Sequence, residues 1–227
     1  RVAEQDYILV GERYKVDKSL DTTYPVVPLS DICEINAENK NPTLAFGDDE
    51  FIYIDISSVE NGTGKVDFSN KIKGTDAPSR AKRAVKKGDI LFSTVRPNLK
   101  AYGYVEREDC DCCVASTGFA VISAKTMVLS KYVYYMLYSE PVQIQLASMM
   151  GKGAYPSVNQ KDVSQIQIPL PSLSIQEDFV AELDSYQKII DGARQVVENY
   201  KPTIQNNSHW ETVRLGDICE LNPRKSE

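Results

Sequence analysis

The residues best suited to chemistry in this chain are basic and amide side chains clustered between positions 80 and 100. Lysine and arginine neutralise phosphates, and arginine and asparagine can also hold guanine and adenine edges through paired hydrogen bonds. The stretch is therefore interpreted as a nucleic-acid contact made by Arg80, Lys82, Arg83, Lys86, Lys87, Arg96, Asn98 and Lys100. A basic, solvated face with no partner is the alternative interpretation.

The distribution of charge favours this interpretation more than the total does. The whole chain carries a net charge of −6, which argues against an anionic partner. Between Lys65 and Arg107, however, eleven lysines and arginines stand against four acidic residues, a local charge of +7 that leaves −13 for the rest. The acidic remainder suits a surface that docks another protein.

A second candidate binding loop runs from Gly151 to Asn159. Its two glycines permit close approach of the backbone to a ligand, and its polar side chains can donate hydrogen bonds to a phosphate or a base edge. The predicted DNA contacts from this loop are Lys152, Tyr155, Ser157 and Asn159. A plain helix-to-strand connection explains the same residues equally well.

Catalytic and metal-binding patterns are missing from the sequence. It has no glycine-rich phosphate loop, and its only histidine is His209. The five cysteines are an odd number, three of them lie within Cys110–Cys113, and their spacing does not fit a zinc site. The sequence therefore predicts reduced thiols, no catalytic residue, no metal and no cofactor.

No apolar run reaches the ~20 residues that a membrane-spanning helix needs, and the first residues lack the build of a signal peptide. We therefore expect a cytoplasmic protein without a membrane partner.

The pattern of apolar and turn residues predicts an α+β fold with a curled mixed β-sheet and short helices. Ser130 is expected to cap a helix over 131–138, and a second helix is expected over 141–150. β-leaning runs separated by turn residues predict strands at 26–35, 51–56, 85–94, 101–105 and 114–122.

A long helix follows, opened by a Ser-x-x-Glu capping box at Ser174–Glu177. Apolar residues then recur at alternating spacings of four and three, which is typical of a helix that pairs lengthwise with another helix. The predicted helix–helix interface consists of Phe179, Leu183, Tyr186, Ile190 and Val197. The alternative is a terminal helix that lies on its own domain.

The most informative feature is a repeat: residues 24–36 return 186 positions later as residues 210–222. The two copies share Val27/Val213, Leu29/Leu215, Asp31/Asp217, Ile32/Ile218, Cys33/Cys219, Glu34/Glu220 and Asn36/Asn222. A repeat this dense and this distant indicates duplication of a whole domain.

In order and spacing, these motifs resemble the specificity (S) subunits of Type I restriction-modification systems. The motifs are a Val-x-Leu-x-Asp-Ile-Cys-Glu opening (27–34 and 213–220), Lys-Gly-Asp-Ile-Leu-Phe-Ser (87–93), Gly-Lys-Gly-Ala-Tyr-Pro-Ser-Val-Asn (151–159) and Ile-Gln-Ile-Pro-Leu-Pro-Ser-Leu-Ser-Ile-Gln-Glu (166–177). The resemblance implies a linker from an upstream region (1–23), a target recognition domain (24–171), a long coiled-coil-forming spacer and dimerisation helix (172–205), and a linker with the start of a second, truncated recognition domain (206–227).

Membership of that family implies a non-catalytic, sequence-specific reader of double-stranded DNA that recognises one half of a bipartite target. The implied partners are an adenine DNA methyltransferase subunit or a fused methylase domain, a restriction subunit, and a second copy of the chain joined through the long helix. Two other classes stay open: an assembly module that uses the helix without direct DNA readout, and a fragment of an enzyme whose active site lies outside these residues.

Overall fold

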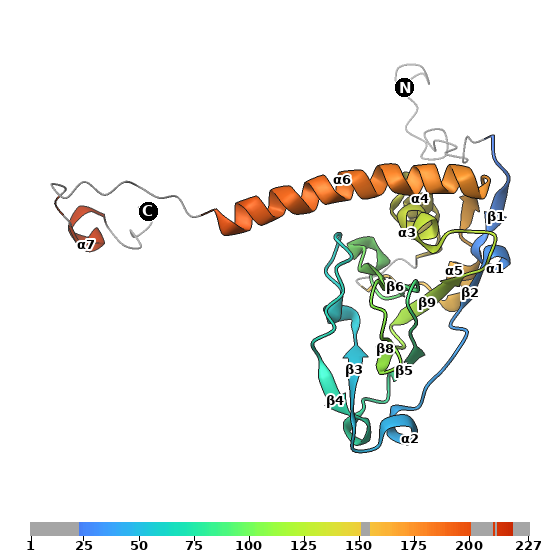
Figure 1. Cartoon of the computed structure of the whole chain (residues 1–227), viewed down its shortest axis with the longest axis horizontal. Coiled ribbons are helices and arrows are strands. Elements are labelled where there is room, and N and C mark those ends of the chain that lie inside the picture. The colour runs from blue at the N-terminus through green and yellow to red at the C-terminus, as the bar shows by residue number, and fades with distance from the viewer. Residues whose placement is uncertain (1–22, 151–154, 201–210, 212, 220–227) are drawn as a thin grey trace, which may run out of the picture. The chain divides into compact units, whose positions relative to one another are not determined.

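The structure is a computed structural model that describes residues 23–150, 155–200, 211 and 213–219 (Figure 1). The chain divides into two units between Ser185 and Tyr186, and the first unit contains the sheets described below. The predicted upstream linker, Lys152, and most of the predicted second linker and second domain lie outside the described residues.

The α+β prediction is confirmed, but the strands form two larger sheets where one was expected. One four-stranded sheet has the order β2-β9-β6-β7 and is antiparallel, and the other has the order β4-β3-β8-β5 and contains the parallel pair β3–β8. A small sheet pairs β1 with β10. The strands are β1 Val26–Pro28, β2 Cys33–Ile35, β3 Glu50–Ile54, β4 Lys71–Lys73, β5 Ala81–Ala84, β6 Ile90–Ser93, β7 Tyr102–Tyr104, β8 Cys113–Ser116, β9 Phe119–Ala124 and β10 Gln167–Pro169.

Helices cover one face of the antiparallel sheet. Alternate residues of β6 point to opposite faces, so Ile90 and Phe92 pack with α3 and α4, whereas Leu91 packs toward β3 and β8. The described helices are α1 Leu29–Ile32, α2 Pro42–Phe46, α3 Ser130–Tyr138, α4 Glu140–Met149, α5 Gln160–Ser164, α6 Leu173–Asn199 and α7 Leu215–Ile218, with short 3-10 turns at Ile56–Ser58, Gly74–Asp76 and Pro97–Leu99.

The apolar core is layered. One cluster lies between the antiparallel sheet and the helices, a second lies between the two larger sheets, and a third covers the outer face of the mixed sheet around Phe51 and Tyr53. β6 and β8 are buried along their whole length because they lie between two of these layers. This packing fixes the ends of β5 and β6, from which the candidate binding residues extend.

The predicted helices exist, and proline lies in the first turn of α4 as expected, but Ser130 and Ser174 do not hold the cap positions predicted for them. Ser130 lies inside α3, and its hydroxyl donates to the carbonyl of Gly88 in place of capping the helix. Ser174 lies inside α6, which begins one residue earlier at Leu173. In both cases the predicted capping residue thus lies within the helix, not before it.

The predicted strand at 26–35 is wrong as a single run. Proline at position 28 ends β1, and the next four residues form the single helical turn α1, whose Leu29 and Ile32 are 0% and 1% exposed. The i, i+3 spacing places both apolar side chains on the inner face of the turn. The second copy forms the same turn as α7, at the corresponding Leu215–Ile218.

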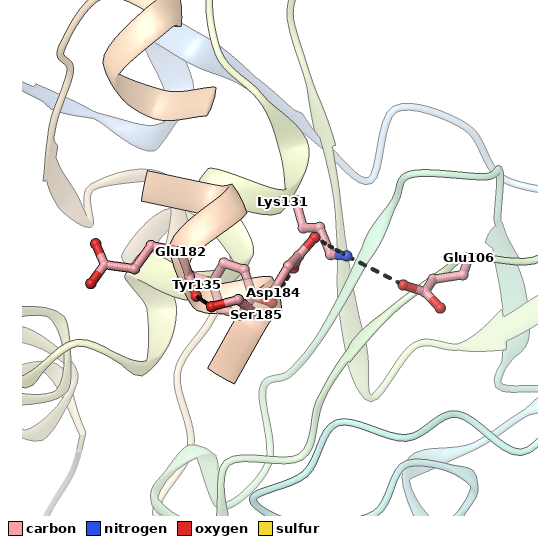
Figure 2. A network of polar contacts seen from close by, with 6 residues as sticks. All are labelled: Glu106, Lys131, Tyr135, Glu182, Asp184 and Ser185. Carbon is pink, nitrogen blue, oxygen red and sulfur yellow. Dashed lines mark hydrogen bonds and ion pairs between the residues drawn. The ribbon is translucent and has the colours of Figure 1, made fainter. Parts of the chain in front are cut away.

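The first three turns of α6 pack on α3. Gln176 is fully buried, and the rings of Phe179 and Tyr132 lie 5.4 Å apart. Figure 2 shows the contacts of Asp184 with Tyr135 and Lys131. Phe179 of the predicted helix–helix interface therefore packs within its own domain. Further along the helix the predicted interface residues Tyr186, Ile190 and Val197 are 52%, 51% and 76% exposed.

Candidate nucleic-acid interface

The turn between β8 and β9 brings two basic segments to the same end of the sheets. The backbone N–H of Thr117 donates to the carbonyl of Arg80 at 2.8 Å, and the N–H of Thr94 donates to the carbonyl of Gly118 at 2.9 Å. Arg80 immediately precedes β5 and Thr94 immediately follows β6, so both segments meet at this turn.

The second candidate loop joins the same end. Val95 forms an antiparallel bridge with Ser157, the N–H of Arg96 donates to the carbonyl of Pro156 at 2.8 Å, and the N–H of Val158 donates to the carbonyl of Thr94 at 3.0 Å. We call residues 80–82, 94–100 and 155–158 the loop cluster. The structure thus joins two stretches that the sequence presents as separate candidates.

The turn after β6 is held in an uncommon backbone conformation. Arg96 and Lys100 have φ angles of 49° and 54°, in the left-handed region that non-glycine residues seldom adopt. Between them, the hydroxyl of buried Tyr102 donates to the carbonyl of Pro97 at 2.7 Å. Such conformations cost about 1–3 kcal/mol each and persist only where the surroundings enforce them. The core therefore dictates the shape of this turn.

The loop cluster presents cationic, amide and apolar side chains together. The guanidinium carbon of Arg96 lies 4.5 Å from the ring centroid of Tyr155, which is 74% exposed. Asn98 is also exposed on the same turn, as are Val95 and Leu99 at 40% and 44%. Sequence reasoning missed both apolar side chains, because isolated apolar residues in a loop carry no periodic signal.

Not all predicted basic residues join this cluster. Arg80 and Lys82 are exposed and form no ion pair within the part of the chain that the structure describes. Lys86 and Lys87 lie beyond the opposite end of the four-residue strand β5, roughly 13 Å away at 3.3 Å per residue.

At that opposite end the lysines face carboxylates. Lys86 pairs with Glu38 at 2.9 Å and Lys87 pairs with Glu108, and these hydrogen-bonded carboxylates raise the pKa of both lysines. Nearby Arg83 donates from Nη1 to the side chain of Asn39 at 2.8 Å. These three cations thus lie apart from the loop cluster and are engaged within the chain.

Asn159 has a structural role. Its side chain accepts a hydrogen bond from the N–H of Asp162 at 3.0 Å, and the Asp162 carboxylate accepts one from the N–H of Asn159 at 2.8 Å. This reciprocal pair starts α5. The Asn-x-x-Asp spacing in the sequence is the signal that could have revealed it.

Other chemistry finds little support among the described residues. No group of three or more histidine, cysteine or acidic side chains there is arranged to hold a metal ion. Burial raises the pKa of the Cys33 and Cys113 thiols to about 12, which disfavours the nucleophilic thiolate. No described helix combines the length and apolar content needed to cross a bilayer.

Comparison with known proteins settles the family. Residues 22–199 match the Type I restriction modification DNA specificity domain, which covers most of the chain and all of the loop cluster. The chain belongs to this family. The resemblance inferred from the ordered motifs is thereby confirmed.

Curated relatives of this specificity domain are specificity subunits by name. The chain is 28% identical over 172 residues to the Type I restriction enzyme HindI specificity subunit of Haemophilus influenzae, covering 70% of this chain and 34% of the relative. It is 25% identical over 166 residues to the MjaIX specificity subunit of Methanocaldococcus jannaschii, covering 61% and 37%. The chain thus spans about a third of the length of these relatives.

Solved structures agree with the specificity-domain assignment. The HsdS subunit from Thermoanaerobacter tengcongensis superposes with a TM-score of 0.68 at 32% identity, over 78% of this chain and 45% of that one. A chain from a study of complex assembly and conformational transition of the type I R-M system gives a TM-score of 0.69 at 30% identity, over 88% and 55%.

Proposed function

We propose that this specificity domain binds double-stranded DNA through the loop cluster and reads one half of a bipartite target. The observation that carries the proposal is the convergence of Arg80, Arg96 and Ser157 at one end of the sheets, through backbone hydrogen bonds made by three separate segments. Cations without ion pairs and exposed amide and hydroxyl groups are the side chains that contact phosphates and bases.

Within the loop cluster we assign two kinds of contact. Arg80, Lys82 and Lys100 neutralise phosphates, because a cation at the edge of a binding surface needs only charge to do so. Arg96 and Asn98, on the turn held by the core, contact base edges, with Tyr155 and Ser157 beside them. We leave Arg83, Lys86 and Lys87 out of the proposed surface because their side chains are engaged elsewhere, and Asn159 because it caps α5.

We further propose the division of labour that the family suggests. Residues 24–171 act as the target recognition domain, and the long helix, predicted over 172–205, acts as spacer and docking element for an adenine methyltransferase. Residues 206–227 begin a second recognition domain, a proposal supported by the shared helical turn of α1 and α7. The protein itself is then a non-catalytic component, as its relatives' names as specificity subunits suggest.

The direct experiment is titration of duplex DNA at several salt concentrations. Neutralising several phosphates releases counterions, so the logarithm of the binding constant should fall with the logarithm of salt with a slope of about −0.9 per phosphate. Binding that is absent or independent of salt, with the methyltransferase partner supplied, would contradict the proposal.

A second candidate function is protein assembly through α6 without DNA readout. It is favoured by the exposure of Tyr186, Ile190 and Val197 on the second half of that helix. Ile190→Glu separates the two functions, with Lys188→Glu on the same helix as the matched control. Loss of self-association or methyltransferase binding with duplex affinity intact would assign the helix to assembly and leave DNA contact to the loop cluster. Loss of both would mean that duplex binding depends on assembly through this helix.

A further inference from the structure

We propose that Arg96 reads a guanine in the major groove and that Tyr155 is the positioning residue that holds its guanidinium for this contact. The inference rests on the proposed function and deepens it, because it assigns one base to one side chain. It starts from the stack of the Arg96 guanidinium on the Tyr155 ring at 4.5 Å.

The stack on Tyr155 leaves the N–H groups at the edge of the Arg96 guanidinium free to donate hydrogen bonds. An arginine that lies flat on an aromatic ring occupies one face of its plane, while its five N–H donors point outward in that plane. Among the described residues, the Arg96 side chain has no carboxylate partner and donates no side-chain hydrogen bond. Two of these donors can therefore meet the O6 and N7 acceptors of guanine, which lie side by side in the major groove.

The backbone fixes both members of the stack relative to one another. Arg96 N–H bonds to the Pro156 carbonyl, one residue after Tyr155, and the Val95–Ser157 bridge flanks the same point. The left-handed conformation of Arg96, followed at once by proline, limits the freedom of the turn further. A guanidinium held at a set orientation suits a contact that depends on direction.

The neighbours of Arg96 favour a base over a phosphate. Val95 and Leu99 are apolar and exposed beside it, and an apolar side chain gains from contact with a base edge such as the thymine methyl. They offer nothing to a phosphate, which is contacted by cations and hydrogen-bond donors. The exposed Arg80 and Lys82 at the same end of the sheets already supply such charge.

The test begins with selection of duplexes from a randomised pool by the full chain, followed by affinity measurements on single-base variants of the selected sequence. We expect one guanine whose replacement, or substitution by 7-deazaguanine, weakens binding roughly ten- to a hundredfold. Because lysine can also donate to guanine O6 and N7, the test uses Arg96→Met, which removes all donors of this side chain. It should abolish the preference at that position and leave the preferences at the other positions unchanged, while the lost charge lowers affinity for all duplexes alike.

The role of Tyr155 has its own readout. Tyr155→Leu should remove most of the same preference, whereas Tyr155→Phe, which keeps the ring, should retain it. The double variant of Arg96→Met and Tyr155→Leu should lose no more of the preference than the worse single variant, because the two side chains act as one unit. Both residues are exposed, so thermal unfolding of each variant should match the wild type.

The outcomes separate this inference from the function on which it rests. If the guanine preference persists in Arg96→Met, whether or not overall affinity falls, the residue does not read guanine and the inference is overturned, while salt-dependent selection of a sequence by the wild type still supports the proposed function. If Tyr155→Leu keeps the preference, the positioning role fails. If the wild type selects no sequence with the methyltransferase partner supplied, the proposed function fails first.

Discussion

The carboxylate of Asp184 connects the hydroxyl of Tyr135 and the ammonium of Lys131, at 2.5 Å and 2.9 Å (Figure 2). Lys131 also pairs with Glu106 at 3.5 Å. Burial acts to lower the pKa of Lys131, but Asp184 and Glu106 outweigh it and the net shift is upward. A charged group on α6 is thus satisfied by two donors from α3, which ties the long helix to the recognition domain.

Replacing Asp184 with alanine should lower the free energy of unfolding by about 1–2 kcal/mol, because two partly buried donors lose their acceptor. Asp178→Ala is the matched control, since Asp178 is exposed on the same helix and should change stability by less than about 0.5 kcal/mol. Urea unfolding measures both. Equal effects of the two variants would mean that the contact contributes nothing to stability.

Gln176 makes a stronger connection at the start of α6. Its side chain is 0% exposed, accepts from the N–H of Leu129 at 2.8 Å and donates to the carbonyl of Pro171 at 2.9 Å. Gln176→Met keeps the volume but leaves both backbone groups buried and unpaired, so we expect a loss of about 2–4 kcal/mol in thermal or urea unfolding. Glu177→Ala, at the next and exposed position, is the control. A loss below 1 kcal/mol for Gln176→Met would show that water replaces the amide.

The repeat supplies a matched pair of substitutions. Ile32 is 1% exposed in the first copy, and its counterpart Ile218 is 64% exposed in the second. Ile32→Ala should therefore cost about 2–5 kcal/mol of stability, whereas Ile218→Ala should cost less than about 0.5 kcal/mol. Similar losses in unfolding experiments on the two variants would contradict the difference in burial between Ile32 and Ile218.

The buried Cys33 thiol predicts a pH dependence. Its pKa rises from 9.0 to about 12 on folding, so above pH 9 the unfolded chain releases a proton that the folded chain keeps. The contribution of this thiol to the free energy of unfolding is therefore fully present below pH 9. It decreases toward pH 12 by up to about 1.4 kcal/mol per pH unit. Cys33→Ala should make that decline shallower by this amount, and Cys219→Ala, at an exposed position, should leave it unchanged. Identical slopes in all three proteins between pH 9 and 11 would rule the effect out.

The sequence predicted those helices and strands in which the apolar pattern and the turn residues along the whole element favour the same secondary structure. The run from Phe51 forms β3, and the helix expected at 131–138 forms α3. The prediction of secondary structure from sequence failed in short segments whose conformation depends on residues far away in the chain. The expected strand at 114–122 is two strands, because Thr117 and Gly118 turn the chain, and a Cβ at Gly118 would meet Ile56 at 2.7 Å. Neighbours far along the chain impose that close approach.

The candidate site shows the same limit. The sequence identified Arg96 and Tyr155 separately, but only the folded chain stacks them, since the bridge between Val95 and Ser157 joins segments distant in sequence. Conversely, Arg80 and Lys87 read as one basic cluster, yet the length of β5 carries them to opposite ends. The sequence therefore predicted which residues could bind DNA, but not which of them lie together in the folded chain.

We propose that DNA contacts the loop cluster and not the whole basic stretch. The most direct test compares the salt dependence of duplex binding for the double variants Arg80→Ala/Lys82→Ala and Lys86→Ala/Lys87→Ala, which remove the same charge. We predict that the first pair reduces the slope of log affinity against log salt by about 2, and that the second reduces it by less than about 0.5. Equal reductions, or a larger one for Lys86 and Lys87, would show that DNA binding is not confined to the loop cluster.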